Sequence, residues 1–215
     1  MCAFRPLPPG CQWLRGADTG HAASVAQGVD YNHEDLVGNM WVNPGEIAGN
    51  GVDDDGNGLV DDVYGANYYA NNGNPMDDNS HGTHCAGTIG AVGNNNIGVV
   101  GVNQNVKIMG CKFMSSSGSG SISNALKCVE YAIAKGAHVT SNSWGGGGYS
   151  SSFAAVLNAA QAAGQLFVAA AGNNNQNIDS YNSYPAGYAH DIVMSVGSST
   201  NTDSRSSFSN YVRKP

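Results

Sequence analysis

The sequence predicts an α/β fold with a mainly parallel sheet, and two observations carry this prediction. From residue 80 onward, short apolar runs typical of strands alternate with stretches whose apolar residues recur at helical spacing. Gly- and Asn-rich breaks separate these runs. Strands that alternate with helices pair in parallel through right-handed crossovers. A chain of 215 residues is long enough for one domain with a sizeable core.

The predicted elements are, in chain order, strands over 106–114, 137–142, 166–170 and 192–196, with helices over 123–135 and 151–163. Ser123 is expected to cap the first helix and Gly136 to end it. The second helix places four apolar residues on one side, namely Phe153, Val156, Leu157 and Ala160. Sites in parallel sheets form beyond the carboxyl ends of the strands, which here are the loops 115–121, 143–150 and 172–177.

The acidic residues are unevenly distributed. Asp and Glu number 16 against 9 Lys and Arg, which gives a formal net charge of -7. No Lys or Arg lies between Arg15 and Lys107, and most of the acids fall in this gap. Phosphate binding needs a basic face, so we expect no nucleic-acid partner. The most apolar stretch, 154–171, is interrupted by polar residues, so we expect no membrane partner, and the N-terminus lacks the apolar run of a signal peptide.

Residues 40–79 are rich in Asn, Asp and Gly and are expected to form a long surface excursion. Within them, oxygen ligands at positions 1, 3 and 5 and a glycine at position 6 match the first half of an EF-hand-like loop, although Tyr64 replaces the glutamate at position 12. The pattern predicts structural calcium, and a solvated acidic loop is the alternative. The candidate ligands are Asp53, Asp55, Asn57 and Asp62.

Five cysteines are an odd number without the spacing of a metal site. At least one is therefore free or paired between chains, and we expect buried free thiols. Cys85 lies directly behind the most specific string of the chain, 79–88, and packing is its expected role. In that string His81 and His84 are three residues apart at a helix start. Taken alone they are either a structural pair or two metal ligands, although no third zinc ligand is nearby.

The segment 80–88, Ser-His-Gly-Thr-His-Cys-Ala-Gly-Thr, resembles the catalytic-histidine motif of the subtilisin-like serine proteases (subtilases, peptidase S8), on the proteinase K branch. Three further segments resemble motifs of that family in the right order: 143–146, 168–173 and 207–211. The resemblance covers residues 28 to about 212. It implies a three-layer fold with helices on both faces of the sheet and with the C-terminal part missing.

The resemblance implies a role for each matching residue. His81 corresponds to the general base, which suits imidazole because it titrates near neutral pH. Asn173 corresponds to the oxyanion donor, and a plain loop asparagine is the alternative. The orienting aspartate is displaced, because an ungapped comparison puts Ala26 at its position. Asp18, in an upstream Asp-Thr-Gly, is the nominal residue for this role.

Two segments resemble the edges of the family's substrate cleft, namely Gly118-Ser119-Gly120 and Ser143-Trp144-Gly145. Small residues there allow another backbone to approach, whereas a flexible linker is the alternative for the first segment. The implied partner is a polypeptide substrate, or an inhibitory pro-peptide, in extended conformation. We expect a monomer, and the resemblance implies secretion of the parent protein.

A second calcium site is implied by resemblance alone. Asp35 matches the family's calcium aspartate, and the loop 93–99 resembles the segment that completes the site. The implied ligands from that loop are the Asn95 side chain and the carbonyl groups of Ile97 and Val99, in a register complicated by one extra residue.

The family's nucleophile lies in a Gly-Thr-Ser-Met-Ala block, and no serine of this chain has that context. We therefore expect a truncated member without activity of its own. Residues 1–27 are interpreted as an atypical N-terminus, through an insertion or a gene-model artefact, and 28–215 as a partial peptidase domain. Two alternatives stay open: a non-catalytic calcium- or peptide-binding relic, and a metal hydrolase at His81 and His84.

Overall fold

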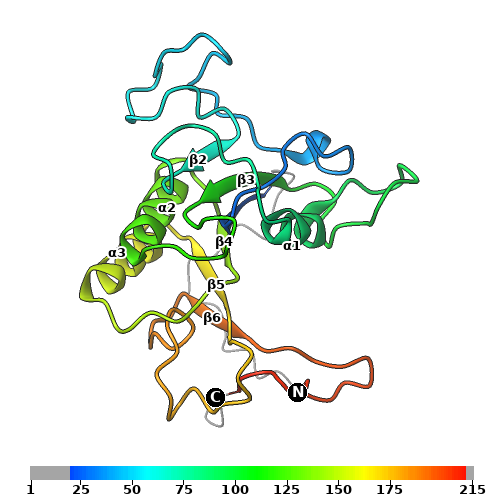
Figure 1. The fold of residues 1–215 in the computed structure, drawn as a ribbon, viewed down its shortest axis with the longest axis vertical. Helices are drawn as coiled ribbons and strands as arrows, with labels where there is room; N and C mark the ends of the chain where they lie inside the picture. Colours follow the sequence, from blue (N-terminus) through cyan, green and yellow to red (C-terminus); the bar gives the residue numbers. More distant parts are fainter. Residues whose placement is uncertain (1–19, 212–215) are drawn as a thin grey trace. The chain divides into compact units, whose positions relative to one another are not determined.

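A computed structural model describes residues 20–211, whose elements are labelled in Figure 1. The chain forms two compact units, described over residues 20–141 and 142–211. Parallel strands and at least one helix occur in each unit. The predicted α/β class is therefore confirmed.

The first unit is built on parallel strands, with β3 between the other two: β1 (His21–Ala26), β2 (Gly65–Asn67) and β3 (Lys107–Lys112). In the register of β1 and β3, Ala22 lies opposite Ile108. The fourth strand, β4 (Val139–Asn142), begins beside β1, next to a hydrogen bond from the His138 N–H to the His21 carbonyl at 2.9 Å. Nearly all of β1 and β3 is buried, which is the pattern of strands covered on both faces.

Two helices cover opposite faces of this sheet: α1 (His81–Gly90) and α2 (Ile122–Ala134). Side chains alternate along a strand, so Ile108 and Cys111 of β3 point to opposite sides. Ile108 packs with Ala86 of α1, whereas Cys111 is bonded to Cys128 of α2. Figure 1 shows the two helices on either side of β3. The three-layer arrangement implied by the resemblance is thus present in this unit.

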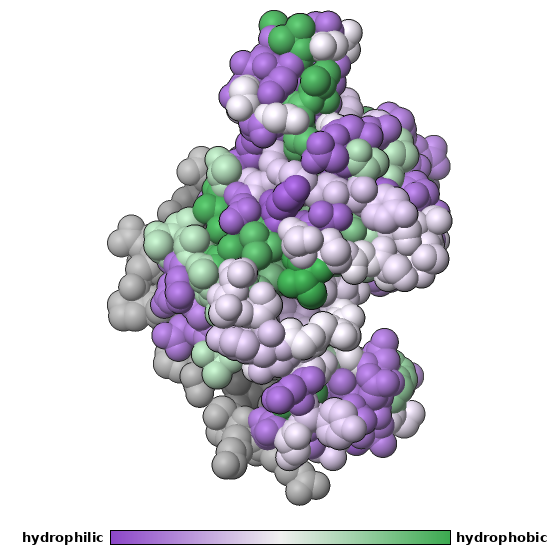
Figure 2. Space-filling model, turned by 60° about the vertical axis from the view of Figure 1, so that its left-hand side comes forward, coloured by the Kyte–Doolittle hydropathy of each residue, from purple (hydrophilic) through white to green (hydrophobic). Residues whose placement is uncertain are grey.

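Residues 40–79 contain one short strand, β2, and otherwise form the predicted excursion. Asp and Asn side chains supply much of its hydrogen bonding: Asp61 accepts the N–H groups of Gly49 and Gly51, and Asp53 accepts those of Asn57 and Gly58. Figure 2 shows this part at the top of the view, where hydrophilic residues surround hydrophobic ones. Polar groups of the loop therefore fix much of its backbone, in addition to buried apolar residues such as Trp41 and Leu59.

The second unit packs one helix against two parallel strands: α3 (Ser151–Ala162), β5 (Leu166–Ala170) and β6 (Val193–Val196). Its core centres on Phe153, which stacks on Tyr188 with ring centroids 5.6 Å apart and meets Trp144 and Phe167 edge-on. The buried residues of α3 are the four predicted from the spacing. The strand predicted at 166–170 is also confirmed.

The predicted cap of α2 is wrong. The helix begins at Ile122, and the hydroxyl of Ser121, rather than that of Ser123, accepts the Asn124 N–H at 3.1 Å. Ser121 has the extended backbone that a capping residue needs, whereas Ser123 lies inside the first turn. None of the helices in the described part of the chain is long and apolar enough to cross a membrane.

The expectation of free thiols is also wrong for one pair of cysteines. Cys111 of β3 and Cys128 of α2 form a disulfide, with Cα atoms 5.7 Å apart. Cys85 is half-buried and outside any disulfide, while Cys2 and Cys11 lie outside the described residues. The disulfide ties one covering helix to the central strand of the first unit.

Replacing both Cys111 and Cys128 by alanine should lower the melting temperature. The bridge spans 17 residues, and closing a loop of this size removes about 3 kcal/mol of unfolded-state entropy. For a chain of this length we expect a drop of roughly 6–12 °C, measured by circular dichroism. Cys85→Ala is the reference variant, with a smaller expected effect. A double variant that melts with the wild type would contradict the prediction.

Candidate active site

Ser80 precedes helix α1 with a left-handed backbone (φ 73°), and its side chain makes no capping hydrogen bond. Asp77 takes over this function: its carboxylate accepts the N–H groups of Asn79 and Ser80 and both the N–H and the hydroxyl of Thr83. Burial raises the pKa of Asp77, but these hydrogen bonds outweigh it and lower the pKa below its usual value. The first turn of α1 is thus fixed by an ionised side chain.

The turn after β1 lies directly against this first turn. A Cβ atom at Gly82 would overlap the Gly28 carbonyl, so the approach requires glycine at position 82. Gly28 has φ 111°, and a side chain there would overlap the backbone of Pro75. The Asp30 N–H donates to the Thr83 hydroxyl at 2.9 Å and closes the contact. The end of β1 is therefore clamped to the start of α1.

This clamp brings His81 to Gln27. The His81 Nδ1 and Gln27 Oε1 atoms are 2.9 Å apart. Gln27 is 7% exposed, and its backbone carbonyl accepts a hydrogen bond from Lys112 Nζ at 2.5 Å. Lys112 also pairs with Asp78 at 2.6 Å.

The motif comparison did not indicate Gln27, because the family motif has a carboxylate at this end of β1. Ala26, at the aspartate position of the ungapped comparison, is buried, and Asp18 lies outside the described residues. The position of Gln27 in the sequence could have identified it, because it is the only polar side chain between the apolar end of β1 and the Gly-Val-Asp-Tyr motif. In the structure an amide faces the ring nitrogen.

The other ring nitrogen of His81, Nε2, lies 3.7 Å from Cys85 Sγ, one turn further along α1. His81 itself is exposed. Among residues 20–211, the only group of three or more potential metal ligands comprises Glu46, Asp55 and Asp62, so the structure adds no third ligand to His81 and His84. The arrangement suits proton transfer better than metal binding.

The segment Gly118–Gly120 forms a tight exposed turn after β3. The Ser115 N–H donates to the Ser119 carbonyl at 2.8 Å, and Gly120 bridges to Met114 in antiparallel fashion. Gly118 has φ 80° and an almost open Cβ position. The turn thus presents its backbone to solvent.

In the second unit, Ser143–Gly145 follow the buried Asn142. The Trp144 indole N–H donates to the Asn142 side chain at 3.2 Å, and the Asn142 amide donates to the Val168 carbonyl at 3.1 Å. Gly145 is exposed at the end of this segment. The anchored indole therefore fixes a backbone segment that stays accessible.

Asn173 is exposed in the loop after β5, and this loop is held by Asn210. The buried Asn210 amide donates to the Ala171 carbonyl at 2.8 Å and accepts the N–H groups of Asn174 and Gln176 at 2.9 and 3.0 Å. Its backbone N–H donates to the Gly172 carbonyl. Asn210 lies in the 207–211 motif, so the structure joins two of the four sequence motifs.

The residues expected at the second calcium site lie together. The Asp35 carboxylate accepts the Asn95 amide at 2.8 Å and the Val99 N–H at 2.9 Å, and Asn95 Oδ1 accepts the Ile97 N–H. These bonds, from Asn95 first, lower the pKa of Asp35. A Cβ atom at Gly98 would overlap the carboxylate, so the loop wraps closely around it.

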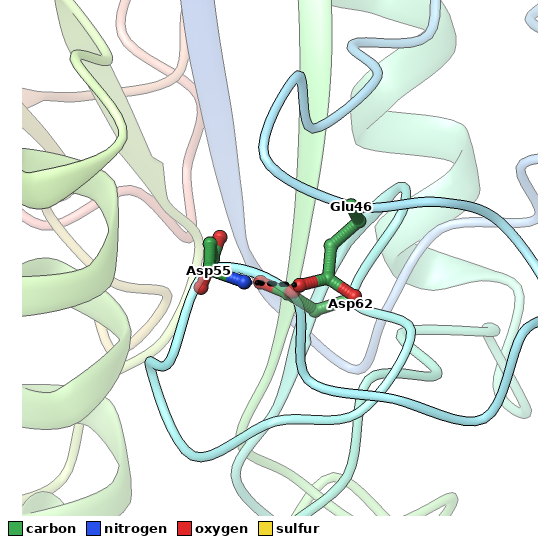
Figure 3. Close-up of side chains that lie close together, drawn as sticks. All are labelled: Glu46, Asp55 and Asp62. Carbon is green, nitrogen blue, oxygen red and sulfur yellow. Dashed lines mark hydrogen bonds between the residues drawn. The ribbon is translucent and has the colours of Figure 1, made fainter.

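The acidic excursion groups a different set of carboxylates from the one expected. Oxygen atoms of Glu46, Asp55 and Asp62 lie within 4.8 Å of one another, and Figure 3 shows the three side chains close together. Asp53 instead accepts loop N–H groups, and Asn57 donates its amide to Asp62 at 2.9 Å. Glu46 joins from outside the EF-hand-like segment, and its buried Oε2 has no hydrogen-bond partner.

Lys135 is the cation at this cluster. Its ammonium group pairs with Asp55 and lies 3.9 Å from Asp62. Burial raises the pKa of Asp55, but the hydrogen bonds from Lys135 and Asn43 lower it overall. The Tyr131 hydroxyl donates to Asp62 at 2.6 Å, and burial followed by this bond raises the pKa of Tyr131. The ammonium group therefore faces two of the three carboxylates, Asp55 and Asp62.

Comparison with known proteins identifies the family. The model of the subtilase family (Peptidase_S8) matches residues 23–215. Subtilisin-like protease 1 of Plasmodium falciparum is 50% identical over 121 residues, which are 56% of this chain and 18% of the relative. Subtilisin Savinase of Lederbergia lenta is 40% identical over 147 residues, which are 68% of this chain and 52% of the relative.

Among solved structures, that of a cold adapted subtilisin-like serine proteinase superposes with a TM-score of 0.67 at 30% identity. The match covers 92% of this chain and 63% of the other. This chain thus spans between about a fifth and two thirds of the relatives it matches. The chain belongs to the subtilase family.

Proposed function

We propose that this chain carries the general base and the oxyanion donor of a serine endopeptidase. One observation carries the proposal: a buried side-chain oxygen holds His81 Nδ1 at 2.9 Å. A ring held at Nδ1 leaves Nε2 to take the proton of an attacking serine and to return it to the leaving amine. The family membership supports the same chemistry.

The nucleophile is the part of this mechanism that the 215 residues do not supply, because no serine stands in a Gly-Thr-Ser-Met-Ala context. Without it, no acyl-enzyme can form. We therefore propose that the protease activity belongs to the parent protein and that this chain alone is inactive. A non-catalytic relic that binds calcium or peptides is the second candidate, since the exposed turns at 118–120 and 143–145 do not depend on the nucleophile.

The substrate we propose is a polypeptide in extended conformation, with an inhibitory pro-peptide as a competing occupant. Each of the segments 118–120 and 143–145 is proposed to pair with such an extended chain through main-chain hydrogen bonds. The open backbone at Gly118 and the accessible Gly145 support this assignment, because a side chain at either place would hinder a second strand.

Asn173 is the proposed oxyanion donor. An oxyanion hole works when its donors are fixed before the charge develops. The bonds from Asn210 to three backbone groups hold the loop on both sides of Asn173. This loop is thus preorganised by a residue that does not itself reach the reacting atoms.

Calcium is the proposed structural cofactor, and the residues fit it. The loop 95–99 wraps around the Asp35 carboxylate, which accepts the Asn95 amide and the Val99 N–H, and Glu46 Oε2 is a buried oxygen without a hydrogen-bond partner beside two further carboxylates. Glu46, Asp55 and Asp62 would hold the ion in the excursion, with Asp35, Asn95, Ile97 and Val99 holding the other. Bound calcium would supply the positive charge that Lys135 alone does not.

We further propose that the parent is a secreted monomer. The Cys111–Cys128 disulfide supports secretion, because such bonds persist in oxidising compartments.

The proposed catalysis predicts a large effect of His81→Ala. In the longest natural reading frame that contains this chain, the variant should lose hydrolysis of a fluorogenic peptide, because removing a subtilisin's catalytic histidine lowers kcat by about 10⁶-fold. His84→Ala, the same change one turn along α1, should retain activity. The 215-residue chain alone should show no turnover.

The outcomes separate the alternatives. Equal loss in both histidine variants, with dependence on bound zinc, would favour the metal hydrolase. Peptide binding without turnover in the full reading frame would favour the relic. Turnover by the 215-residue chain would contradict its proposed inactivity.

Calcium should raise the melting temperature of the chain relative to a chelated sample, because the ion binds the folded loops. Glu46→Gln should reduce this increase, since it removes a charge from the cluster. Asp53→Asn is the matched control, because its carboxylate serves loop N–H groups outside the cluster. Identical melting curves with calcium and with chelator would contradict the proposal.

Asn210→Ala should destabilise the second unit by about 2–3 kcal/mol, because it removes the partners of three backbone groups. Asn173→Ala, an exposed change in the same loop, should cost less than about 0.5 kcal/mol. In the active parent the order reverses: Asn173→Ala should raise the barrier by about 3–4 kcal/mol. Thermal melts and peptide kinetics of the two variants measure this contrast.

A further inference from the structure

The contact between His81 and Gln27 differs from the carboxylate contact that serine hydrolases use. The Gln27 amide oxygen lies 2.9 Å from His81 Nδ1, at the end of a buried strand. We infer that Gln27 is the positioning residue of His81 and holds it as the neutral Nδ1–H tautomer, with the Nε2 lone pair on the side of the Cys85 thiol, whose Sγ lies 3.7 Å away. This inference rests on the proposed function for its catalytic meaning, although the tautomer is a property of the folded chain itself.

Other histidines of the chain show the reverse arrangement. His138 Nδ1 accepts the backbone N–H of His21 at 3.1 Å, and His33 Nδ1 accepts the backbone N–H of Asp35 at 3.1 Å. A nitrogen that accepts a hydrogen bond carries a lone pair, so when these rings are neutral their proton is on Nε2. At His81 Nδ1 the partner is the Gln27 Oε1 atom, an acceptor, instead of a backbone N–H donor. The hydrogen bond therefore requires a proton on Nδ1.

The surroundings of Gln27 keep its amide in place. Lys112 Nζ donates to the backbone carbonyl of Gln27 at 2.5 Å and is itself paired with Asp78. Gly28 follows in a conformation that favours glycine, packed against the backbone at Pro75. The backbone of Gln27 is thus fixed on both sides, and the residue as a whole is 7% exposed.

An amide oxygen and a carboxylate do not serve the histidine equally. Both accept the Nδ1–H bond and orient the ring, but only the carboxylate carries a negative charge that stabilises the imidazolium formed during proton transfer. In this chain the charged group that touches Gln27 is the Lys112 ammonium, which is balanced by Asp78. Gln27 therefore supplies orientation and tautomer without charge compensation.

The test is the tautomer of His81 in the 215-residue chain, read from ¹⁵N NMR of histidine-labelled protein at a pH where the imidazoles are neutral. In the wild type, Nδ1 of His81 should give the protonated-type signal, while His33 and His138 give the opposite pattern. Gln27→Ala should move the tautomer ratio of His81 toward Nε2–H by about tenfold, as expected for one lost neutral hydrogen bond. Gln27→Glu should retain Nδ1–H, because a carboxylate only accepts.

Gln161→Ala, an exposed change on α3, is the control and should leave the His81 signals unchanged. Unchanged signals of His33 and His138 verify that each variant is folded. An Nε2–H tautomer of His81 in the wild type, or an unchanged ratio in a folded Gln27→Ala, would overturn the inference. Because no peptide is involved, a missing protease activity in the parent leaves this readout intact and counts against the proposed function alone.

Discussion

The position of His81 depends on a backbone contact between two glycines. Gly82 lies against the carbonyl of Gly28 so closely that neither chain segment could approach with a side chain at position 82. Their preceding neighbours, His81 and Gln27, are thereby placed within hydrogen-bond distance. The Asp77–Thr83–Asp30 bonds hold the same contact from the side. The geometry of the base is thus set by the absence of two methyl groups as much as by the polar atoms.

In the loops, polar side chains provide the hydrogen bonds to backbone groups that neighbouring strands provide in the sheet. Asp53 and Asp61 satisfy the N–H groups of the excursion, and Asn210 satisfies those of the loop at 171–176. These segments have few apolar anchors, so their order depends on short polar side chains that bond to nearby backbone. The acidic side chains also bring negative charges close together, since Glu46, Asp55 and Asp62 form one cluster and Lys135 pairs with only Asp55 and Asp62.

The sequence predicted the structure where the periodicity of apolar residues or the spacing of motifs determines it. Helix α3 and strand β5 followed from the spacing of apolar residues, and Asp35 lies beside Asn95 and Val99, which the resemblance groups with it, although it accepts their N–H groups. It was less informative for contacts between residues that are far apart in the sequence and meet only in the folded structure. Glu46 and the Cys111–Cys128 pair join segments that no local pattern connects. Gln27 escaped notice because an amide was not the residue type sought, and the α2 cap because two serines of equal propensity stand two residues apart.

Asn210 also has a consequence for the order in which the molecule forms during synthesis. Its bonds reach back 34 to 39 residues, to Gln176 and Ala171. Ribosomes add about 5–20 residues per second, so the loop around Asn173 waits roughly 2–8 s for the residue that fixes it. At the start of that interval the residues of α3 and β5 have been synthesised, but β6, with which β5 pairs, and the Asn210 side chain have not. The loop is therefore among the last parts of the second unit to become ordered on a nascent chain.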